Sequence, residues 1–166
     1  TVSKNEYNNH LVQNNKVSYL FDAATGRLRQ WSKKKKKLIS TITQSFDYAN
    51  YRWVENDAAG GDSYETGNGI LTRKPADAPS ADENGVVRFS TTELGSLCNV
   101  KYDYTLYPDG TLDLKATYEP QSADLRRIGT QLILPQGFEQ VSYYARGPWD
   151  NFIDRRDAAF LGRYET

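Results

Sequence analysis

Residues 143–164 read YYARGPWDNFIDRRDAAFLGRY, the stretch in which aromatic rings and paired charges are most closely interleaved. Proline fixes φ and lacks a backbone donor, so Gly147-Pro148 predicts the end of a strand through Tyr143–Arg146. An irregular segment should follow, and its buried backbone groups need partners. Aspartate and arginine side chains are the partners that this stretch offers. We therefore expect the stretch to tie the strands of the chain together.

The centre of this stretch, RGPWDNFIDR, resembles a signature in the C-terminal domain of family 2 β-galactosidases, which is often called the small-chain domain. The residues that carry the likeness are Arg146, Gly147, Pro148, Asp150, Asn151, Phe152, Asp154 and Arg155. Two of them depart mildly from the family pattern, because Asp150 stands where Glu is more common and Phe152 where Tyr is. The resemblance implies a structural motif formed by Arg146, Asp150, Asn151, Asp154 and Arg155.

Composition limits the possible functions. The chain has 166 residues, enough for one domain with a core. Basic and acidic residues both number 21, so no long-range field favours nucleic acid or an anionic membrane. Cys98 is the single cysteine, which excludes an internal disulfide and is expected to be a small buried group. The sequence contains no Met, even at position 1, so we expect a fragment of a longer polypeptide.

Residues 16–31 predict a β-hairpin. VSYLF and RLRQW alternate between apolar and polar residues, and Asp22 and Gly26 supply turn chemistry between them. The pattern F-D-x-x-T/S-G-x-L also resembles the opening hairpin of the small-chain domain. Lys33–Lys37 is interpreted as a solvated turn that protects a sheet edge, in preference to a site for polyanions.

From Val86 onward the sequence consists of short runs of alternating apolar and polar residues, separated by turn residues. Strands are expected in VVRFSTTEL, LCNVKYDYTLY, TLDLKATYEP, IGTQLILP and FEQVSYYAR. A total of roughly eight to ten strands without a convincing helix predicts an all-β, two-sheet β-sandwich. The resemblance narrows this to the galactose-mutarotase-like, or supersandwich, type, truncated because the family's domain is longer. Residues 1–166 are expected to form one β-sandwich domain fragment, with a lead-in at 1–15 and a long loop region at 55–85.

The loop region holds most of the candidate site. Here the family has an N/R-x-P-x-D-N-D segment, and Asn56-Asp57 match its last two residues. In family enzymes the loop that follows reaches the catalytic barrel, and Gly60-Gly61 would give the backbone the freedom of a hinge. Aromatic faces stack on sugar rings, while amides and carboxylates bond sugar hydroxyls. The candidate carbohydrate-binding residues are Trp53, Asn56, Asp57 and Trp149.

A different interpretation is that these rings belong to the core or to a domain interface. No catalytic residue is predicted, although a retaining glycosidase needs two carboxylates about 5–5.5 Å apart. Asp150, Asp154 and Asp157 lie among arginines, which lower the pKa of a carboxyl group and suit a structural ion network. The resemblance places both catalytic glutamates in a separate barrel domain. A lone histidine, His10, makes neither a triad nor a metal site, so no metal or cofactor is expected.

The sequence thus predicts a non-catalytic domain of a β-galactosidase that supports the catalytic barrel and borders its carbohydrate site. The parent enzyme would hydrolyse terminal β-galactosides, and the isolated chain would be inactive. Expected partners are the barrel domain, the galactoside and a second copy paired through exposed sheet edges. Two alternatives are a stand-alone carbohydrate-binding module and a structural sandwich from another glycosidase family. The compartment is left open between a bacterial cytoplasm and periplasm.

Overall fold

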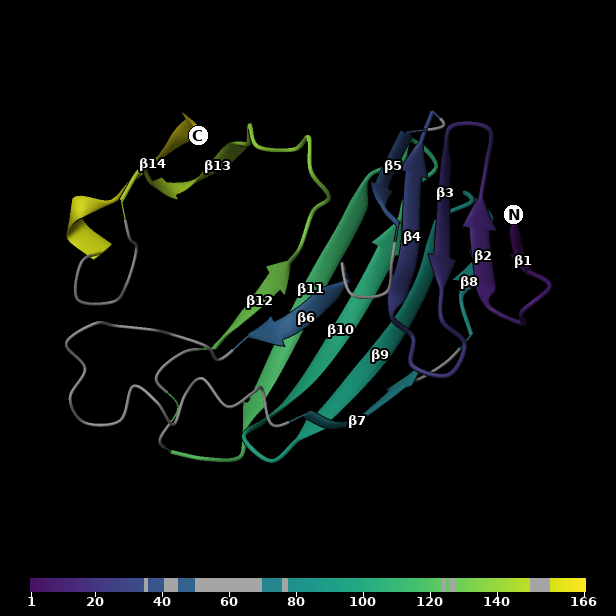
Figure 1. Cartoon of the computed structure of the whole chain (residues 1–166), viewed down its shortest axis with the longest axis horizontal. Helices are drawn as coiled ribbons and strands as arrows, with labels where there is room; N and C mark the ends of the chain where they lie inside the picture. Colours follow the sequence, from purple (N-terminus) through teal and green to yellow (C-terminus); the bar gives the residue numbers. More distant parts are fainter. Residues whose placement is uncertain are drawn as a thin grey trace. The chain divides into compact units, whose positions relative to one another are not determined.

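The structure is a computed structural model of the chain (Figure 1). It describes residues 1–34, 36–40, 45–49, 70–75, 78–123, 125, 128–149 and 156–166. The described residues form two compact units, Thr1–Ile133 and Leu134–Thr166. Apart from one 3-10 turn, every regular element in the described ranges is a β-strand, and all pairing is antiparallel. The all-β prediction is confirmed.

The first unit contains a five-stranded sheet in the order β1-β2-β3-β4-β5, which we call the N-terminal sheet. Its strands are β1 (Val2–Lys4), β2 (His10–Gln13), β3 (Val17–Phe21), β4 (Leu28–Lys33) and β5 (Lys36–Ile39). The β3–β4 hairpin is the one that the sequence predicts. The lysine run lies where β4 passes into β5, and β5 is the edge strand, which agrees with its interpretation as an edge turn.

The turn between β3 and β4 shows why the hairpin could be predicted. Asp22 Oδ1 accepts hydrogen bonds from the backbone N–H groups of Ala24 and Thr25, at 3.1 and 2.8 Å. Gly26 takes a φ of 71°, a conformation that glycine adopts without strain. Burial opposes ionisation of Asp22, but hydrogen bonds from Thr25 and Arg29 outweigh it and lower the pKa of the carboxyl group.

A second sheet, which we call the central sheet, has the order β11-β10-β9-β7, with β8 also paired to β9 (Figure 1). Its strands are β7 (Ile70–Pro75), β8 (Ser80–Ala81), β9 (Val87–Gly95), β10 (Cys98–Leu106) and β11 (Leu112–Pro120). The three long strands match the sequence prediction. Strands β7 and β8 lie inside the region that was expected to be a loop.

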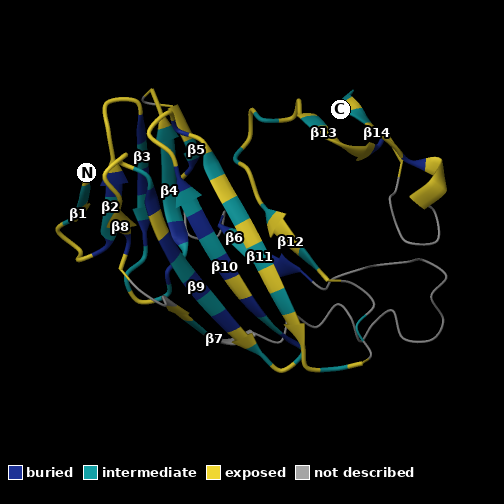
Figure 2. Ribbon diagram, turned by 180° about the vertical axis from the view of Figure 1, so that it is seen from behind, coloured by how far each residue is buried: buried dark blue, intermediate teal, exposed yellow. Residues whose placement is uncertain are grey.

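The hydrophobic core is formed by residues of the N-terminal and central sheets. Alternate residues of β9 and β10 are buried, and buried and exposed bands succeed one another along these strands (Figure 2). The ring of Phe21 in β3 lies 4.3 Å from that of Phe89 and 5.5 Å from that of Tyr104, between ring centroids. Two facing sheets that share one core make a β-sandwich. The narrower prediction of a galactose-mutarotase-like type stays a prediction.

One end of this sandwich is closed by hydrogen bonds to the β10–β11 turn. The Tyr19 hydroxyl donates to the Gly110 carbonyl at 3.0 Å, and Asn14 Nδ2 donates to the Pro108 carbonyl at 2.7 Å. Gly110 has a φ of 91°, as the predicted Pro-Asp-Gly turn requires. The turn that joins two strands of the central sheet is thereby fastened to the N-terminal sheet.

A two-stranded ribbon, β6 (Phe46–Ala49) with β12 (Gly129–Leu132), completes the first unit. Phe46 and Tyr48 place their rings 6.4 Å from Tyr104 and 6.2 Å from Tyr118, between centroids, so β6 packs on the central sheet. Buried Ser45 accepts a hydrogen bond at 3.2 Å from the backbone N–H of Leu28, which also links β6 to the N-terminal sheet.

The second unit is a hairpin of β13 (Ser142–Gly147) and β14 (Phe160–Glu165), with a 3-10 turn, η3 (Arg156–Ala158), before β14. Strand β13 ends at the predicted Gly147-Pro148 break. Strand β14 was not predicted, because Gly162 interrupts its apolar pattern. Residues 150–155, the centre of the stretch expected to tie the strands together, lie outside the described residues. That expectation stays a prediction.

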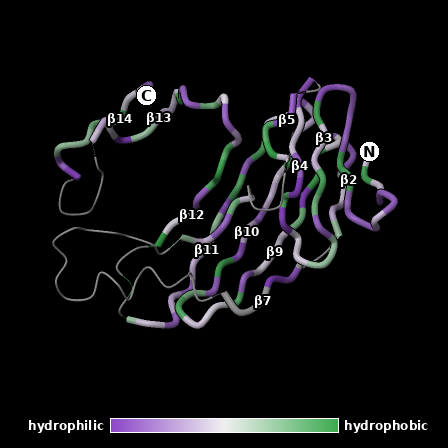
Figure 3. Tube along the Cα trace, viewed as in Figure 1, coloured by the Kyte–Doolittle hydropathy of each residue, from purple (hydrophilic) through white to green (hydrophobic). Residues whose placement is uncertain are grey.

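The described residues contain no helix of the length and apolarity that crossing a bilayer requires. Hydropathy instead changes along the long strands without forming one extended apolar run (Figure 3). This pattern is typical of strands that bury one face.

The buried Tyr19 hydroxyl gives the fold a testable dependence on alkaline pH. Burial raises the pKa of Tyr19 to about 12, and the negative charge of Asp109 adds to the effect. Because the folded-state pKa lies above the ordinary value of 10.0, the group stabilises the fold below pH 10 and this contribution is lost as the pH rises towards 12. Tyr19→Phe should cost about 1 kcal/mol at pH 7 through the lost hydrogen bond.

The stability gap between Tyr19→Phe and the unsubstituted chain should shrink between pH 9 and pH 11, as measured by urea unfolding. Tyr7→Phe, at a ring that is 76% exposed, is the matched control for loss of a phenol hydroxyl. A gap for Tyr19→Phe that stays constant across this pH range would contradict the assignment.

Candidate functional site

Most of the predicted site residues lie outside the described part of the chain. These are Trp53, Asn56, Asp57, Gly60 and Gly61 of the loop region, and Asp150, Asn151, Asp154 and Arg155 of the structural motif. Their roles stay predictions. The structure does describe Arg146 and Trp149, together with the two strands that flank residues 50–69.

The two strands that flank residues 50–69 meet in a cluster of four charged side chains, which we call the ion cluster: Arg27, Asp47, Arg73 and Glu93. Arg73 Nε donates to Glu93 Oε1 at 2.5 Å, and Arg73 Nη2 lies 3.3 Å from Asp47 Oδ1. Arg27 Nη2 pairs with the other oxygen of Asp47. The Arg73 guanidinium therefore bridges the carboxylates of Asp47 and Glu93. The Asp47 carboxylate in turn binds both Arg27 and Arg73.

Local sequence explains how each charge reaches this place. Glu93 follows Val87, Phe89 and Thr91 at alternate positions of β9, so its side chain points to the buried face. The β7–β9 ladder places Arg73 directly opposite Glu93. Asp47 comes from β6 of the ribbon. Arg27 directly precedes β4 of the N-terminal sheet.

Burial makes the charged forms of these side chains energetically costly, because they lose contact with water. The Glu93 side chain is 3% exposed, and those of Arg27 and Asp47 are 14% exposed. Burial raises the pKa of Asp47, and the two arginines only partly offset it while Glu93 adds to it. Within the described residues, Glu93 Oε2 and Arg27 Nε are buried without a hydrogen-bond partner. The four formal charges sum to zero, as a buried cluster requires.

The chemistry of the cluster is structural. Each carboxylate binds at least one arginine, which is the arrangement of a structural ion network. The described residues also hold no group of three His, Cys, Asp or Glu side chains that could bind a metal ion. Sequence reasoning missed the cluster. The available signal was Glu93, a charge in phase with the apolar positions of its strand.

The hairpin unit carries the second candidate surface. Four large apolar side chains project from it into solvent: Tyr144, Trp149, Phe160 and Leu161 are 69, 72, 71 and 62% exposed. A two-stranded hairpin is at most marginally stable alone, so a surface of this kind calls for a partner or a ligand. Trp149, a predicted sugar contact, is thus accessible within its unit.

Other contacts hold the hairpin unit together. Arg146 Nη1 donates to the carbonyl of buried Ala159 at 3.0 Å, which joins β13 to the turn before β14. The ring of Tyr164 lies against Gly147 and Gly162, where an added Cβ would come within 3.1 Å of it. The Tyr164 hydroxyl donates to the Phe160 carbonyl at 2.8 Å. A side chain at either glycine would therefore force the Tyr164 ring to shift by a few tenths of an ångström.

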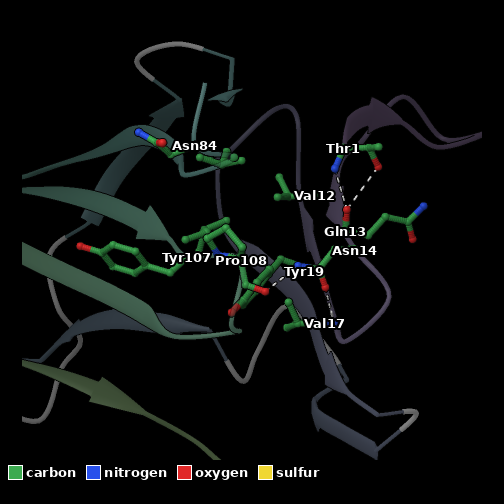
Figure 4. A pocket seen from close by; sticks show the side chains of 12 residues that line it. Thr1, Val12, Gln13, Asn14, Val17, Tyr19, Asn84, Tyr107 and Pro108 are labelled. Atoms are coloured by element: carbon green, nitrogen blue, oxygen red, sulfur yellow. Dashed lines mark hydrogen bonds between the residues drawn. The ribbon is translucent and has the colours of Figure 1, made fainter. Parts of the chain in front are cut away.

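A cavity of about 230 Å³ lies beside the β10–β11 turn. Figure 4 shows Tyr107 and Pro108 on one side of it and Thr1 and Gln13 on the other. Its volume falls below the roughly 300–1,000 Å³ of most ligand sites, and its inner wall belongs to the core. We assign it no function.

Comparison with known proteins adds a family likeness. The family model described as "Beta galactosidase small chain" matches residues 13–166. The chain is 25% identical over 179 residues to a β-galactosidase of Lactococcus lactis subsp. lactis (strain IL1403), covering 92% of this chain and 17% of that protein.

Two other relatives match shorter parts. A Staphylococcus xylosus β-galactosidase is 37% identical over 82 residues, covering 49% of this chain and 7% of that protein. A Halalkalibacterium halodurans β-galactosidase is 33% identical over 72 residues, covering 40% of this chain and 7% of that protein. The chain therefore spans less than a fifth of the length of each of these relatives.

The ion cluster predicts an unequal response to two glutamate substitutions. Glu93→Ala removes one partner of a buried pair and leaves the Arg73 guanidinium without its closest carboxylate, so it should destabilise the chain by about 3 kcal/mol. Glu119→Ala, at an exposed position of β11, should change stability by less than about 0.5 kcal/mol. Urea unfolding at pH 7 measures both. Equal effects would show that the cluster contributes nothing specific.

Proposed function

Because the chain belongs to the β-galactosidase small-chain family, we propose that it is a non-catalytic β-sandwich domain of a β-galactosidase. In this role it supports the catalytic barrel of the same polypeptide, which hydrolyses terminal β-galactosides. The observation that carries the proposal is the family match over residues 13–166. The ion cluster supports it, because both of its carboxylates, Asp47 and Glu93, are bound to arginine.

We further propose that the loop of residues 55–69 borders the carbohydrate site of the barrel. Support comes from the residues Asn56-Asp57, which match the family's segment at this place, and from Trp53 beside them. Strands β6 and β7 precede and follow this segment in the sequence, and an ion pair between Asp47 and Arg73 links the two strands. The barrel domain and the galactoside are accordingly the expected partners of the chain.

The non-catalytic role is tested with a chromogenic galactoside. The isolated chain should give no turnover above buffer, whereas the full-length polypeptide that carries it should hydrolyse the substrate. Asn56→Ala and Asp57→Ala in the full-length polypeptide should raise KM, because a sugar hydroxyl would lose a hydrogen-bond partner. Turnover by the isolated chain at rates typical of enzymes, about 1–1,000 per second, would refute the non-catalytic claim.

A stand-alone carbohydrate-binding module is the second candidate function, and the exposed rings of the hairpin unit favour it. Tyr144, Trp149 and Phe160 offer flat apolar faces of the kind that stack on sugars. In this case the isolated chain should bind galactosides with millimolar or tighter affinity in calorimetric titration. Trp149→Ala should abolish the binding. Tyr7→Ala, at an equally exposed ring of the other unit, is the matched control and should leave it intact.

A further inference from the structure

Strand β11 is a long and regular edge of the central sheet. It pairs with β10 over nine residues without a register shift, and no described strand pairs with its other side. An edge of this kind can add a further strand. The other edges discourage such pairing, because β1 has only three residues, β5 begins with two lysines and β7 contains a register shift. Strand β11 has a proline only at its last position, Pro120.

The backbone of β11 offers hydrogen-bonding groups on this open side. The Tyr107 N–H donates to the Thr111 carbonyl at 2.9 Å and the Gln121 N–H to the Leu97 carbonyl at 2.8 Å, just beyond the two ends of the β10–β11 ladder. Hydrogen-bonded pairs alternate along an antiparallel ladder, so the odd-numbered residues of β11 bond to β10. The even-numbered residues direct their N–H and C=O groups away from β10: Leu112, Leu114, Ala116 and Tyr118.

The core-facing side chains of β11 are incompletely covered. The corresponding residues of β10 are fully buried, as Tyr102 is at 1% exposed. Figure 2 shows β11 instead as alternating half-buried and exposed bands. Its half-buried residues pack against the core: Leu112, Leu114, Ala116 and Tyr118. A strand added beside β11 would therefore bury apolar surface as well as form hydrogen bonds.

The exposed side chains of β11 carry a self-complementary charge pattern. Lys115 and Glu119 lie at equal distances in sequence on either side of Thr117, and no described ion pair includes either of them. If an identical strand runs antiparallel with Thr117 opposite Thr117, each Lys115 lies opposite a Glu119. Opposite charges that face each other directly across two strands stabilise their pairing.

The nearest register with the same number of ion pairs is less favourable. Centring the two strands on Leu114 would place Lys115 opposite Asp113. It would also bring Asp109 opposite Glu119, and both of these acidic residues are exposed. Like charges in opposing positions destabilise a strand pair. The charge pattern therefore favours the register centred on Thr117.

We propose that β11 is an interaction surface for a second copy of this chain. The β11 strands of the two copies pair antiparallel about a two-fold axis at Thr117 and join the two central sheets into one. Ala116 of each copy then exchanges backbone hydrogen bonds with Tyr118 of the other, and the Leu114 N–H donates to the Pro120 carbonyl. A closed two-fold contact of this kind uses the same surface on both copies. The inference does not depend on the proposed function.

Sedimentation of the 166-residue chain over a concentration series tests the proposal. The mass should rise from monomer to dimer between about 1 and about 500 μM, because a contact between two strands is small. Lys115→Glu places two acidic pairs in the contact and should raise the dimer Kd about tenfold or more. Lys115 is exposed, so the variant should keep its fold.

Two variants make this result specific. Lys115→Glu combined with Glu119→Lys exchanges the charges and should restore the Kd to within about threefold of the unsubstituted value. Lys74→Glu is the matched control, because Lys74 is an exposed lysine on β7, at the opposite edge of the same sheet, and should leave the Kd unchanged. A Kd that Lys115→Glu leaves unchanged, or that the exchanged pair fails to restore, would overturn the proposal.

Hydrogen exchange reads the pairing directly. The amides of Leu114, Ala116 and Tyr118 should become protected as the concentration rises, whereas Leu112 lies beyond the overlap and should not. Protection of Leu112 in place of Tyr118 would indicate the register centred on Leu114 and contradict the one proposed. A chain that stays monomeric throughout the series would show that the edge is not a contact between copies and leave it to a strand of another protein segment.

Discussion

A charge buried in a sandwich is costly unless a partner of opposite charge accompanies it, and this constraint bears on how the strands of the first unit meet. Glu93 points into the interior because the alternation of β9 leaves it no other direction. An uncompensated carboxylate there would cost several kcal/mol, so a cation has to come within reach. Arg73 on the neighbouring strand β7 supplies this cation. Asp47 binds Arg73 as well, and Arg27 pairs with Asp47, so that two positive charges accompany two negative ones. Elements from three sheets are thereby drawn to one point.

The aromatic core and the ion cluster stabilise the first unit by different physical interactions. Burial of Phe21, Phe89 and Tyr104 supplies non-directional stabilisation, which scales with the apolar area removed from water. Such rings tolerate a range of packing angles. Ion pairs with hydrogen-bond geometry accept few arrangements, because their attraction must offset the cost of desolvating both charges. The core holds the sheets together, while the cluster links the ribbon to both of them.

Local chemistry made part of the fold predictable from sequence. The β3–β4 hairpin follows from Asp22 and Gly26, whose hydrogen bonds and positive φ are properties of the turn itself. The β10–β11 pair follows from alternation and a Pro-Asp-Gly turn. Strand β14 escaped prediction because Gly162 gives no β signal. That glycine is explained only by the Tyr164 ring that covers it.

The candidate site was less predictable, because its described part depends on contacts between residues far apart in sequence. Asp47, Arg73 and Glu93 come from separate parts of the sequence. The local sequence around each residue does not identify the residues that it contacts. The sequence could show only that Glu93 occupies an apolar position and so requires a cation. The carbohydrate-binding residues predicted from the family resemblance are a different case. Except for Trp149, they lie outside the described residues.

The placement of the cluster connects the ribbon to both sheets of the sandwich. A segment whose two ends lie on one hairpin is positioned by that hairpin alone. Residues 50–69 instead begin after a strand of the ribbon and end before a strand of the central sheet. Any change in how these sheets pack would therefore move one end relative to the other. The ion pair between Arg73 and Asp47 links the ribbon to the central sheet, and among the described side chains Arg73 is the one that binds a carboxylate on each side.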